Sequence, residues 1–334
     1  MLYVGVDAHK STSHLTIVNE NGVVLKRKQV PSSLEGLRHV LAPYSEPVKA
    51  VLEASYSWGP VYDWLDELVD EVVLAHPAKV KAIADARIKN DKVDSETLAH
   101  LLRADLIPPA YAPSKEIRAC KRVLRQRTFF VGIRTMTKNR VWGLLGQHAI
   151  KLPDASDLFG KNALRELDLS ELPLSDQRLV HENLELIQVL NERIAATERL
   201  IKELASGDAA VEWLSSLPGI GTFFSVLIRY EVDDVRRFAT AKKFVSHTGL
   251  IPSTYASAKR LTHGPLTKQG NKWLRWAFTE AVTPATRCSP FLRRYYERIK
   301  ARRGALDARV ATARKLAELA WTVWTERRCY YEER

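Results

Sequence analysis

Cysteine is scarce in this sequence, and the few cysteines follow no recognisable spacing. Cys120, Cys288 and Cys329 lie far apart along a chain of 334 residues. An odd and scattered set excludes a disulfide framework and lacks the paired spacing of a zinc site. Such usage is typical of a reducing compartment, and we therefore expect a cytoplasmic protein.

Long hydrophobic runs are also missing. No stretch approaches the roughly 20 uninterrupted apolar residues that a membrane-spanning helix requires. The first residues, Met-Leu-Tyr-Val-Gly-Val-Asp, lack the basic and apolar regions of a secretion signal. The sequence contains no internal repeat and no low-complexity tract. We therefore expect two or three ordinary domains and no membrane partner.

Acidic residues are the third shortage. The chain has 39 Asp and Glu residues against 51 Lys and Arg, which gives a formal net charge of +12. A protein with such an excess of cations usually binds a polyanion. Nucleic acid is the first candidate for this polyanion, and an acidic membrane surface is the second.

The first 75 residues alternate between strand and helix patterns. An Asn-Gly pair at 21–22 predicts a hairpin turn, and Pro-Ser-Ser at 31–33 predicts a helix start. The predicted elements are strands over 2–7, 13–18 and 23–30, a helix over 34–41, a strand over 48–52, a helix over 58–68 and a strand over 71–75. This order predicts an α/β RNase H-like (RuvC-like) domain, with a mainly α-helical region after it.

Carboxylates occupy the positions that such a sheet makes functional. Asp7 and Glu53 each end a predicted strand, and Asp91 and Asp94 stand three residues apart at the start of a helix. Residues three apart share a helical face, so four oxygen ligands from three elements can converge. Oxygen-only ligands suit Mg²⁺ or Mn²⁺ rather than zinc. Two such ions could clamp the attacking and leaving oxygens of a phosphodiester.

Each of these acids also has a structural interpretation. Asp7 could cap a turn, Glu53 could pair with Lys49, and Asp94 could cap its helix. Glu96 is the alternative to Asp94, but residues two apart do not share a helical face.

The segment from 115 to 140 carries nine basic residues and a single acid, Glu116. A solvated charged face is one interpretation, and contact with phosphates is the one we favour. The residues that we expect to bind nucleic acid here are Arg122, Arg125, Arg134 and Lys138.

A heptad pattern runs from 175 to 204. Val180, Ile187, Ile194 and Ile201 repeat every seven residues, and Gly207 predicts the end of the helix. The pattern fits a coiled coil between two protomers and equally a helix packed in the core of its own chain.

Two segments of the C-terminal region have the composition of phosphate sites. In Leu-Pro-Gly-Ile-Gly at 217–221, Gly219 and Gly221 can expose backbone N–H groups at a helix start. The segment 249–260 is expected to be an exposed loop, and the segment 266–275 is expected to open a helix. Cations that could hold a phosphate beside Ser257 are Lys259, Arg260, His263 and Lys268.

Together these motifs resemble those of the DEDD transposases of the insertion-sequence "one-ten" family, relatives of the Piv DNA invertases. The similar segments are Val-Gly-Val-Asp ending at 7, Leu-Glu-Ala-Ser around 53, Asn-Asp-Lys-Val-Asp over 90–94, Leu-Pro-Gly-Ile-Gly, Gly-Leu-Ile-Pro over 249–252 and Thr-Lys-Gln-Gly-Asn-Lys-Trp-Leu-Arg over 267–275. The resemblance spans nearly the whole chain.

The resemblance implies an RNA-guided, site-specific DNA recombinase of an insertion sequence, associated with the nucleoid. It implies a catalytic set of Asp7, Glu53, Asp91, Asp94 and a nucleophilic Ser257. It also implies donor and target DNA, a guide RNA from the same element, and a homo-oligomer, dimer or tetramer, as partners. Ala258 stands where many relatives have Gly, so Ser253 is the alternative nucleophile.

Two other functions stay open at this point. A Holliday-junction resolvase would use the same carboxylates with water as nucleophile, and a non-catalytic scaffold would only bind nucleic acid. The expected domains are a catalytic RuvC-like domain over 1–110, a basic helix with a coiled-coil-like helix over 111–206, and a helical domain with the Gly loop and the serine loop over 207–334.

Overall fold

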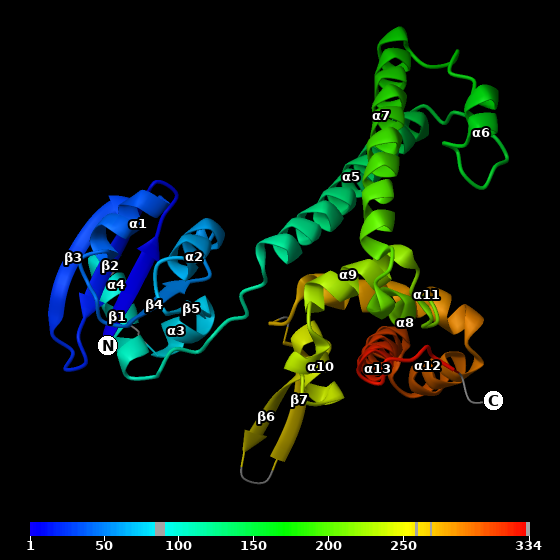
Figure 1. The fold of residues 1–334 in the computed structure, drawn as a ribbon. Helices are drawn as coiled ribbons and strands as arrows, with labels where there is room; N and C mark the ends of the chain where they lie inside the picture. Colours follow the sequence, from blue (N-terminus) through cyan, green and yellow to red (C-terminus); the bar gives the residue numbers. More distant parts are fainter. Residues whose placement is uncertain (84–90, 258–259, 268, 332–334) are drawn as a thin grey trace. The chain divides into compact units, whose positions relative to one another are not determined.

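The computed structural model describes residues 1–83, 91–257, 260–267 and 269–331, which form two compact units, 1–115 and 116–334. The first unit is built on a five-stranded sheet with the order β3-β2-β1-β4-β5 (Figure 1). Its strands are β1 (Leu2–Ala8), β2 (Thr12–Val18), β3 (Val24–Pro31), β4 (Val48–Glu53) and β5 (Glu71–Ala75). The first three strands are antiparallel, whereas β4 is parallel to both β1 and β5.

Helices cover both faces of this sheet. On one face, α1 (Leu34–Leu41) and α2 (Trp58–Asp66) bury Leu37 and Leu65 against the strands. On the other face, α4 (Asp91–Arg103) and α3 (Pro77–Ile83) bury Leu98 and Val80. The Ser33 hydroxyl accepts a hydrogen bond from the Gly36 N–H and so caps α1 as predicted.

A long helical hairpin begins the second unit. It pairs α5 (Lys115–Gln147) with α7 (Leu174–Ala205), and the short α6 (Lys161–Glu166) lies in the connection (Figure 1). Side-chain contacts join Arg127 to Glu198, Arg134 to Asn191, and His148 to Asp176. The partners descend along α7 as they ascend along α5, so the two helices are antiparallel. Gly207, with φ of 74°, follows the end of α7 as predicted.

The heptad stripe of α7 is buried inside its own chain. Val180 and Ile187 pack with Val141 and Leu145 of α5, and Ile201 belongs to the core of the following helices. Of the two interpretations of the heptad, the structure therefore supports packing within the chain. The alternative, pairing between protomers along this stripe, is wrong because its apolar side chains are already covered.

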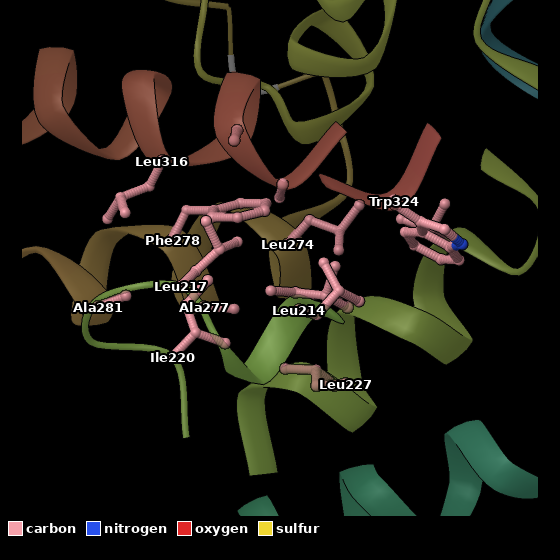
Figure 2. Packing of buried hydrophobic residues seen from close by; sticks show 14 of the residues in the cluster. Leu214, Leu217, Ile220, Leu227, Leu274, Ala277, Phe278, Ala281, Leu316 and Trp324 are labelled. Carbon is pink, nitrogen blue, oxygen red and sulfur yellow. The ribbon is translucent and has the colours of Figure 1, made fainter. Parts of the chain in front are cut away.

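The remaining elements surround a second core (Figure 2). They are α8 (Ala209–Ser215), α9 (Thr222–Val232), the 3₁₀ turn η1 (Val235–Arg237), α10 (Ala241–Thr248), the hairpin β6 (Pro252–Ser257) and β7 (Arg260–Leu266), α11 (Lys272–Cys288), α12 (Pro290–Arg303) and α13 (Ala305–Thr325). Leu217 and Ile220 of the Gly loop pack there with Ala277 and Ala281 of α11. The predicted fold class, an RNase H-like α/β region followed by a mainly helical region, is confirmed.

None of the helices within the described ranges is long and apolar enough to cross a membrane.

Candidate active site

Asp7 and Glu53 lie side by side at the carboxyl ends of two neighbouring interior strands of the first unit's sheet. Strands β1 and β4 are parallel, with Val6 paired to Leu52, and each acid follows that last pair. Side chains alternate between the two faces of a strand. Tyr3 of β1 and Val51 of β4 belong to the core under α4, so Asp7 and Glu53, at alternate positions, also lie on the α4 face.

Helix α4 is pressed against β1 close to Asp7. A β-carbon on Gly5 would lie 1.9 Å from the backbone oxygen of Ser95, so only glycine allows this approach. The Ser95 hydroxyl hydrogen-bonds that of Thr16 at 2.9 Å, and both residues are buried. Asp91 begins this helix and Asp94 precedes Ser95, so the backbone brings the carboxylate-bearing turn of α4 onto the sheet face of Asp7. For Asp91 the structure describes the backbone only, whereas Asp94 is exposed.

Glu96, the alternative to Asp94, has a structural partner. The Arg27 guanidinium on β3 donates to its carboxylate at 2.6 Å. This contact directs the Glu96 side chain toward the antiparallel end of the sheet.

Two histidines that the sequence did not single out flank Asp7. His9 Nε2 lies 3.2 Å from a carboxylate oxygen of Asp7. His14 faces Asp7 across the β1–β2 pair, and its ring centroid lies 6.4 Å from that of His9. His14 could have been found from the sequence. If β1 and β2 form a tight hairpin, the residue that pairs with Asp7 must lie only a few positions after it.

The donor chemistry at these strand ends fits a hard divalent cation. Asp7 and Glu53 offer carboxylate oxygens from adjacent strands, as Mg²⁺ prefers. Among the described side chains, no three His, Cys, Asp or Glu groups converge closely enough to hold a metal ion. Asp91, the remaining member of the predicted set, has no described side chain.

Ser257 is the last residue of β6, at the tip of the hairpin in the second unit (Figure 1). It pairs with Arg260, the first residue of β7. The expectation of a loop over 249–260 is wrong for 252–257, because Thr254, Tyr255 and Ala256 pair with β7. Ser253, the alternative serine, lies at the other end of this strand. Ala258, Lys259 and Lys268 lie outside the described residues, and no side chain is described for Arg260 or His263.

The root of this hairpin is fixed by two glycines. A β-carbon on Gly270 would lie 2.2 Å from the backbone nitrogen of Gly249, so the chain segments before and after the hairpin cross in direct contact. The Asn271 N–H donates to the His247 carbonyl at 2.7 Å, and the Thr267 N–H donates to Ile251 at 3.2 Å. The hairpin that carries Ser257 is thus anchored at both ends.

Beneath this root lies a buried acid that the sequence analysis also missed. Glu231 of α9 is 3% exposed and accepts hydrogen bonds from Arg125 at 2.8 Å and from Asn271 at 2.9 Å. Lys121 lies 3.8 Å from it, and burial lowers the pKa of this lysine although Glu231 opposes the shift. Asn271 also caps α11 through its side-chain oxygen. Glu231 therefore ties α5 to the segment that closes the hairpin.

The same region holds a neutral histidine. The ring of His247 on α10 lies tilted against that of Phe238, with ring centroids 5.0 Å apart. Burial, with the charges of Arg237 and Lys121 next in importance, lowers its pKa to about 4. Within the described part of the chain, its buried Nε2 has no hydrogen-bond partner, as expected for an uncharged ring.

The two glycines of the Gly loop have different surroundings. Gly219 has φ of 78°, and a β-carbon there would lie 2.4 Å from the Ala281 carbonyl oxygen of α11. Gly221 precedes α9, and no described atom lies within 4 Å of the position of its β-carbon. Gly219 thus has a packing role, while Gly221 leaves the start of α9 open.

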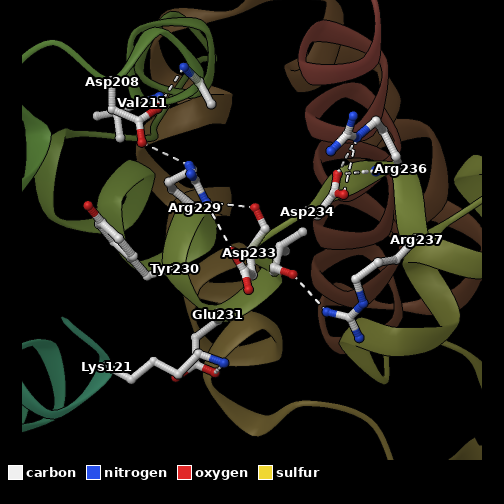
Figure 3. Close-up of polar contacts among 12 residues, drawn as sticks. Lys121, Asp208, Val211, Arg229, Tyr230, Glu231, Asp233, Asp234, Arg236 and Arg237 are labelled. Atoms are coloured by element: carbon white, nitrogen blue, oxygen red, sulfur yellow. Dashed lines mark hydrogen bonds and ion pairs between the residues drawn. The ribbon is translucent and has the colours of Figure 1, made fainter. Parts of the chain in front are cut away.

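Arg229 of α9 links α9 to α8, the helix before the Gly loop. Its guanidinium donates to Asp208, the cap of α8, at 2.8 Å and to the Asp233 carbonyl (Figure 3).

Several cations of α5 have partners within the chain. Arg125 contacts Glu231, Arg134 contacts Asn191, and Lys138 lies 3.6 Å from Asp157 and 4.5 Å from the Phe159 ring centroid. Arg122 and Arg140 are exposed, and within the described ranges neither makes an ion pair.

Two family models match this chain in succession. The model of the DEDD transposases of IS110, described as "Transposase", matches residues 4–150, and "Transposase IS116/IS110/IS902 family" matches residues 211–297. The chain belongs to the IS110/IS116/IS902 family of DEDD transposases. The first match contains the carboxylates of the α/β unit, and the second contains both the Gly loop and the serine hairpin of this transposase.

Relatives of this transposase align over almost their whole length. A probable family 20 transposase of Pseudomonas aeruginosa is 26% identical, over 98% of each chain. The transposase for insertion sequence element IS1328 of Yersinia enterocolitica is 24% identical, over 97% of this chain and 96% of its own. The transposase for IS1111A of Coxiella burnetii is 23% identical, over 98% and 90%. The enzyme is thus an insertion-sequence transposase, a class that cleaves and exchanges DNA strands.

Proposed function

We propose that this transposase is a site-specific recombinase in which Ser257 is the nucleophile and Asp7, Glu53, Asp91 and Asp94 are the metal ligands. The observation that carries the proposal is the position of Ser257 at the tip of an anchored hairpin. A nucleophile there can enter a DNA groove, while the rigid root keeps its position defined.

The reaction would proceed in two steps, strand cleavage and strand joining. The Ser257 oxygen forms a bond to phosphorus, the phosphodiester bond to one DNA oxygen breaks, and the serine proton ends on that leaving oxygen. A hydroxyl of a second strand then attacks the phosphoserine, which restores the serine and joins the new pair of ends. Nearby cations such as Arg260 would stabilise the charge that develops on the phosphate.

Asp7 and Glu53, with Asp91 and Asp94 on the adjoining turn of α4, would hold Mg²⁺ or Mn²⁺. When bound, the ion supplies positive charge against the phosphate and favours ionisation of an attacking hydroxyl. The protein's own part would be to supply these carboxylates from two neighbouring strands and from the helix packed on the same face of the sheet.

We assign the metal ligands to residues 1–110, nucleic-acid contacts and assembly to 111–206, and the serine chemistry to 207–334. A guide RNA from the same element is the proposed partner of the exposed cations Arg122 and Arg140 and of the open start of α9 at Gly221. We also propose a homo-oligomer on chromosomal DNA. Its contacts exclude the α7 heptad stripe, which is covered within the chain.

Trapping the covalent intermediate tests the serine. Full-length protein is incubated with labelled element-end DNA and Mg²⁺, denatured, and analysed by mass spectrometry of the adducted peptide. We expect DNA on Ser257, no adduct in Ser257→Ala, and an adduct in the matched control Ser253→Ala.

Strand cleavage by Ser257→Ala without any adduct would instead indicate water as nucleophile, as in a resolvase. Sequencing of nucleic acid that co-purifies after expression with the flanking non-coding DNA tests the RNA. One element-derived RNA supports guidance, whereas random cellular RNA contradicts it.

A further inference from the structure

A cleft of about 800 Å³ lies between the hairpin root and the last two helices. Leu250 and Pro252, at the start of β6, line one side together with Gly264 and Leu266 of β7. Helices α12 and α13 line the other. The cleft shares no residue with the proposed metal ligands or with the proposed RNA contacts Arg122, Arg140 and Gly221.

One face of α12 supplies the positive charge of this cleft. Tyr295, Ile299, Arg302 and Arg303 follow one another at helical spacing, so they share the face that lines the cleft. Arg302 and Arg303 are exposed, and in the described part of the chain neither makes an ion pair. Each guanidinium therefore has its donors available for a phosphate.

The lining holds three arginines against two acids, so it keeps a net positive charge. Glu318 is 3.3 Å from Arg314 and 3.6 Å from Lys315, so two cations already share it. Asp307, in the first turn of α13, is the other acid of the lining. The floor between the charges is apolar, with Leu250, Leu266 and Val310.

Cations above an apolar floor are complementary to a sugar–phosphate backbone, whose phosphates are charged and whose deoxyribose is largely apolar. RNA fits less well, because its 2′-hydroxyl would meet these apolar side chains without a hydrogen-bond partner.

The cleft lies at the opposite end of β6 from Ser257. Pro252 lines the cleft and Ser257 ends the same strand five residues later, about 17 Å away at the usual rise of a strand. Duplex DNA advances about 3.4 Å per base step, so for a duplex that runs along β6 this distance corresponds to about five steps.

We propose that this cleft binds the backbone of the DNA strand about five nucleotides from the phosphate that Ser257 attacks, with Arg302 and Arg303 as its phosphate ligands. The proposal rests on the function proposed above, because it takes Ser257 to mark the cleaved phosphate. The role of the cleft is to hold the strand in register with the hairpin tip.

Equilibrium binding tests this proposal without any cleavage. The affinity of full-length protein for a 30-base-pair DNA duplex is measured by fluorescence anisotropy between 50 and 200 mM salt. Loss of two phosphate contacts should reduce the slope of log K against log salt by about 1.8. Wild-type protein should then lose about 12-fold more affinity than Arg302→Ala/Arg303→Ala over this range. The charge-conserving Arg302→Lys/Arg303→Lys protein should retain most of the slope.

The matched control is Lys242→Ala/Lys243→Ala, which removes two exposed cations of α10 that do not line the cleft. An unchanged slope for Arg302→Ala/Arg303→Ala, or a change equal to that of the control, overturns the proposal. A slope change seen with duplex RNA but not with DNA also overturns it. Because Ser257→Ala protein can be used throughout, failure of the serine chemistry would not affect this result.

Discussion

At the scale of single residues, His247 should make the unfolding free energy depend on pH. Burial lowers its pKa from 6.5 to about 4, so between these values the unfolded chain binds a proton that the folded chain does not. Stability due to this residue is therefore complete above pH 6.5 and falls as the pH decreases toward 4. The expected loss is roughly 3 kcal/mol.

Urea unfolding of the second unit at several pH values measures this loss. His247→Gln should lack it, whereas the control His181→Gln, at an exposed position of α7, should follow the wild type. Parallel pH profiles for wild type and His247→Gln would contradict the assignment of a neutral buried ring.

A second prediction at this scale concerns the stability of the Gly270→Ala variant. In Gly270→Ala the new methyl group would overlap the backbone of Gly249, which cannot move aside without displacing the hairpin. We expect a loss of about 3 kcal/mol of unfolding free energy, near the upper end for overpacking.

Gly132→Ala is the matched control, since no described atom lies within 4 Å of its β-carbon position in the middle of α5. That change should stabilise the helix by up to about 1 kcal/mol. Equal effects of the two substitutions on the urea midpoint would show that Gly249 and Gly270 do not cross in contact.

At the scale of elements, Glu231 joins α5, α9 and the start of α11. Glu231→Gln leaves Lys121 and Arg125 without their buried counter-charge, and we expect a loss of roughly 3 kcal/mol. The control is Glu198→Gln, which breaks the half-exposed pair with Arg127 and should cost about 0–1 kcal/mol. Similar losses in thermal unfolding would mean that the Glu231 cluster does not stabilise the unit.

The elements also show how far sequence reasoning reaches. The strands that carry Asp7 and Glu53 were predictable, because an apolar run leads up to each acid. The partner of the α7 stripe was not, since a heptad shows that Ile187 is buried but not which chain covers it. The β6–β7 hairpin was missed because the residues after Ser257 lack the Gly or Asn of a common turn.

The charge composition of the sequence indicated a nucleic-acid partner, but it did not show which cations are available to bind it. The excess of cations on α5 is clear in the sequence, yet Arg125, Arg134 and Lys138 contact groups far away in the chain. Such contacts depend on tertiary structure and leave no local pattern. Glu231 did leave one, as a lone acid one helical turn after Leu227 in a buried stripe.

At the scale of the whole molecule, two units share one proposed reaction. The α/β unit presents Asp7 and Glu53 at the carboxyl ends of two neighbouring strands of its sheet, and the helical unit presents Ser257 on an anchored hairpin. Neither set would suffice alone, because the serine needs its attack on a charged phosphate supported by the metal site.

The most direct test of this claim is the yield of Ser257–DNA adduct in Asp7→Asn protein with Mg²⁺. Asparagine keeps the size of the side chain but removes a charged metal ligand. We predict that the adduct falls below detection, as it should in wild-type protein with EDTA, while DNA affinity and the unfolding midpoint stay close to wild type. Adduct formed at the wild-type rate by Asp7→Asn, or by wild-type protein in EDTA, would contradict the account.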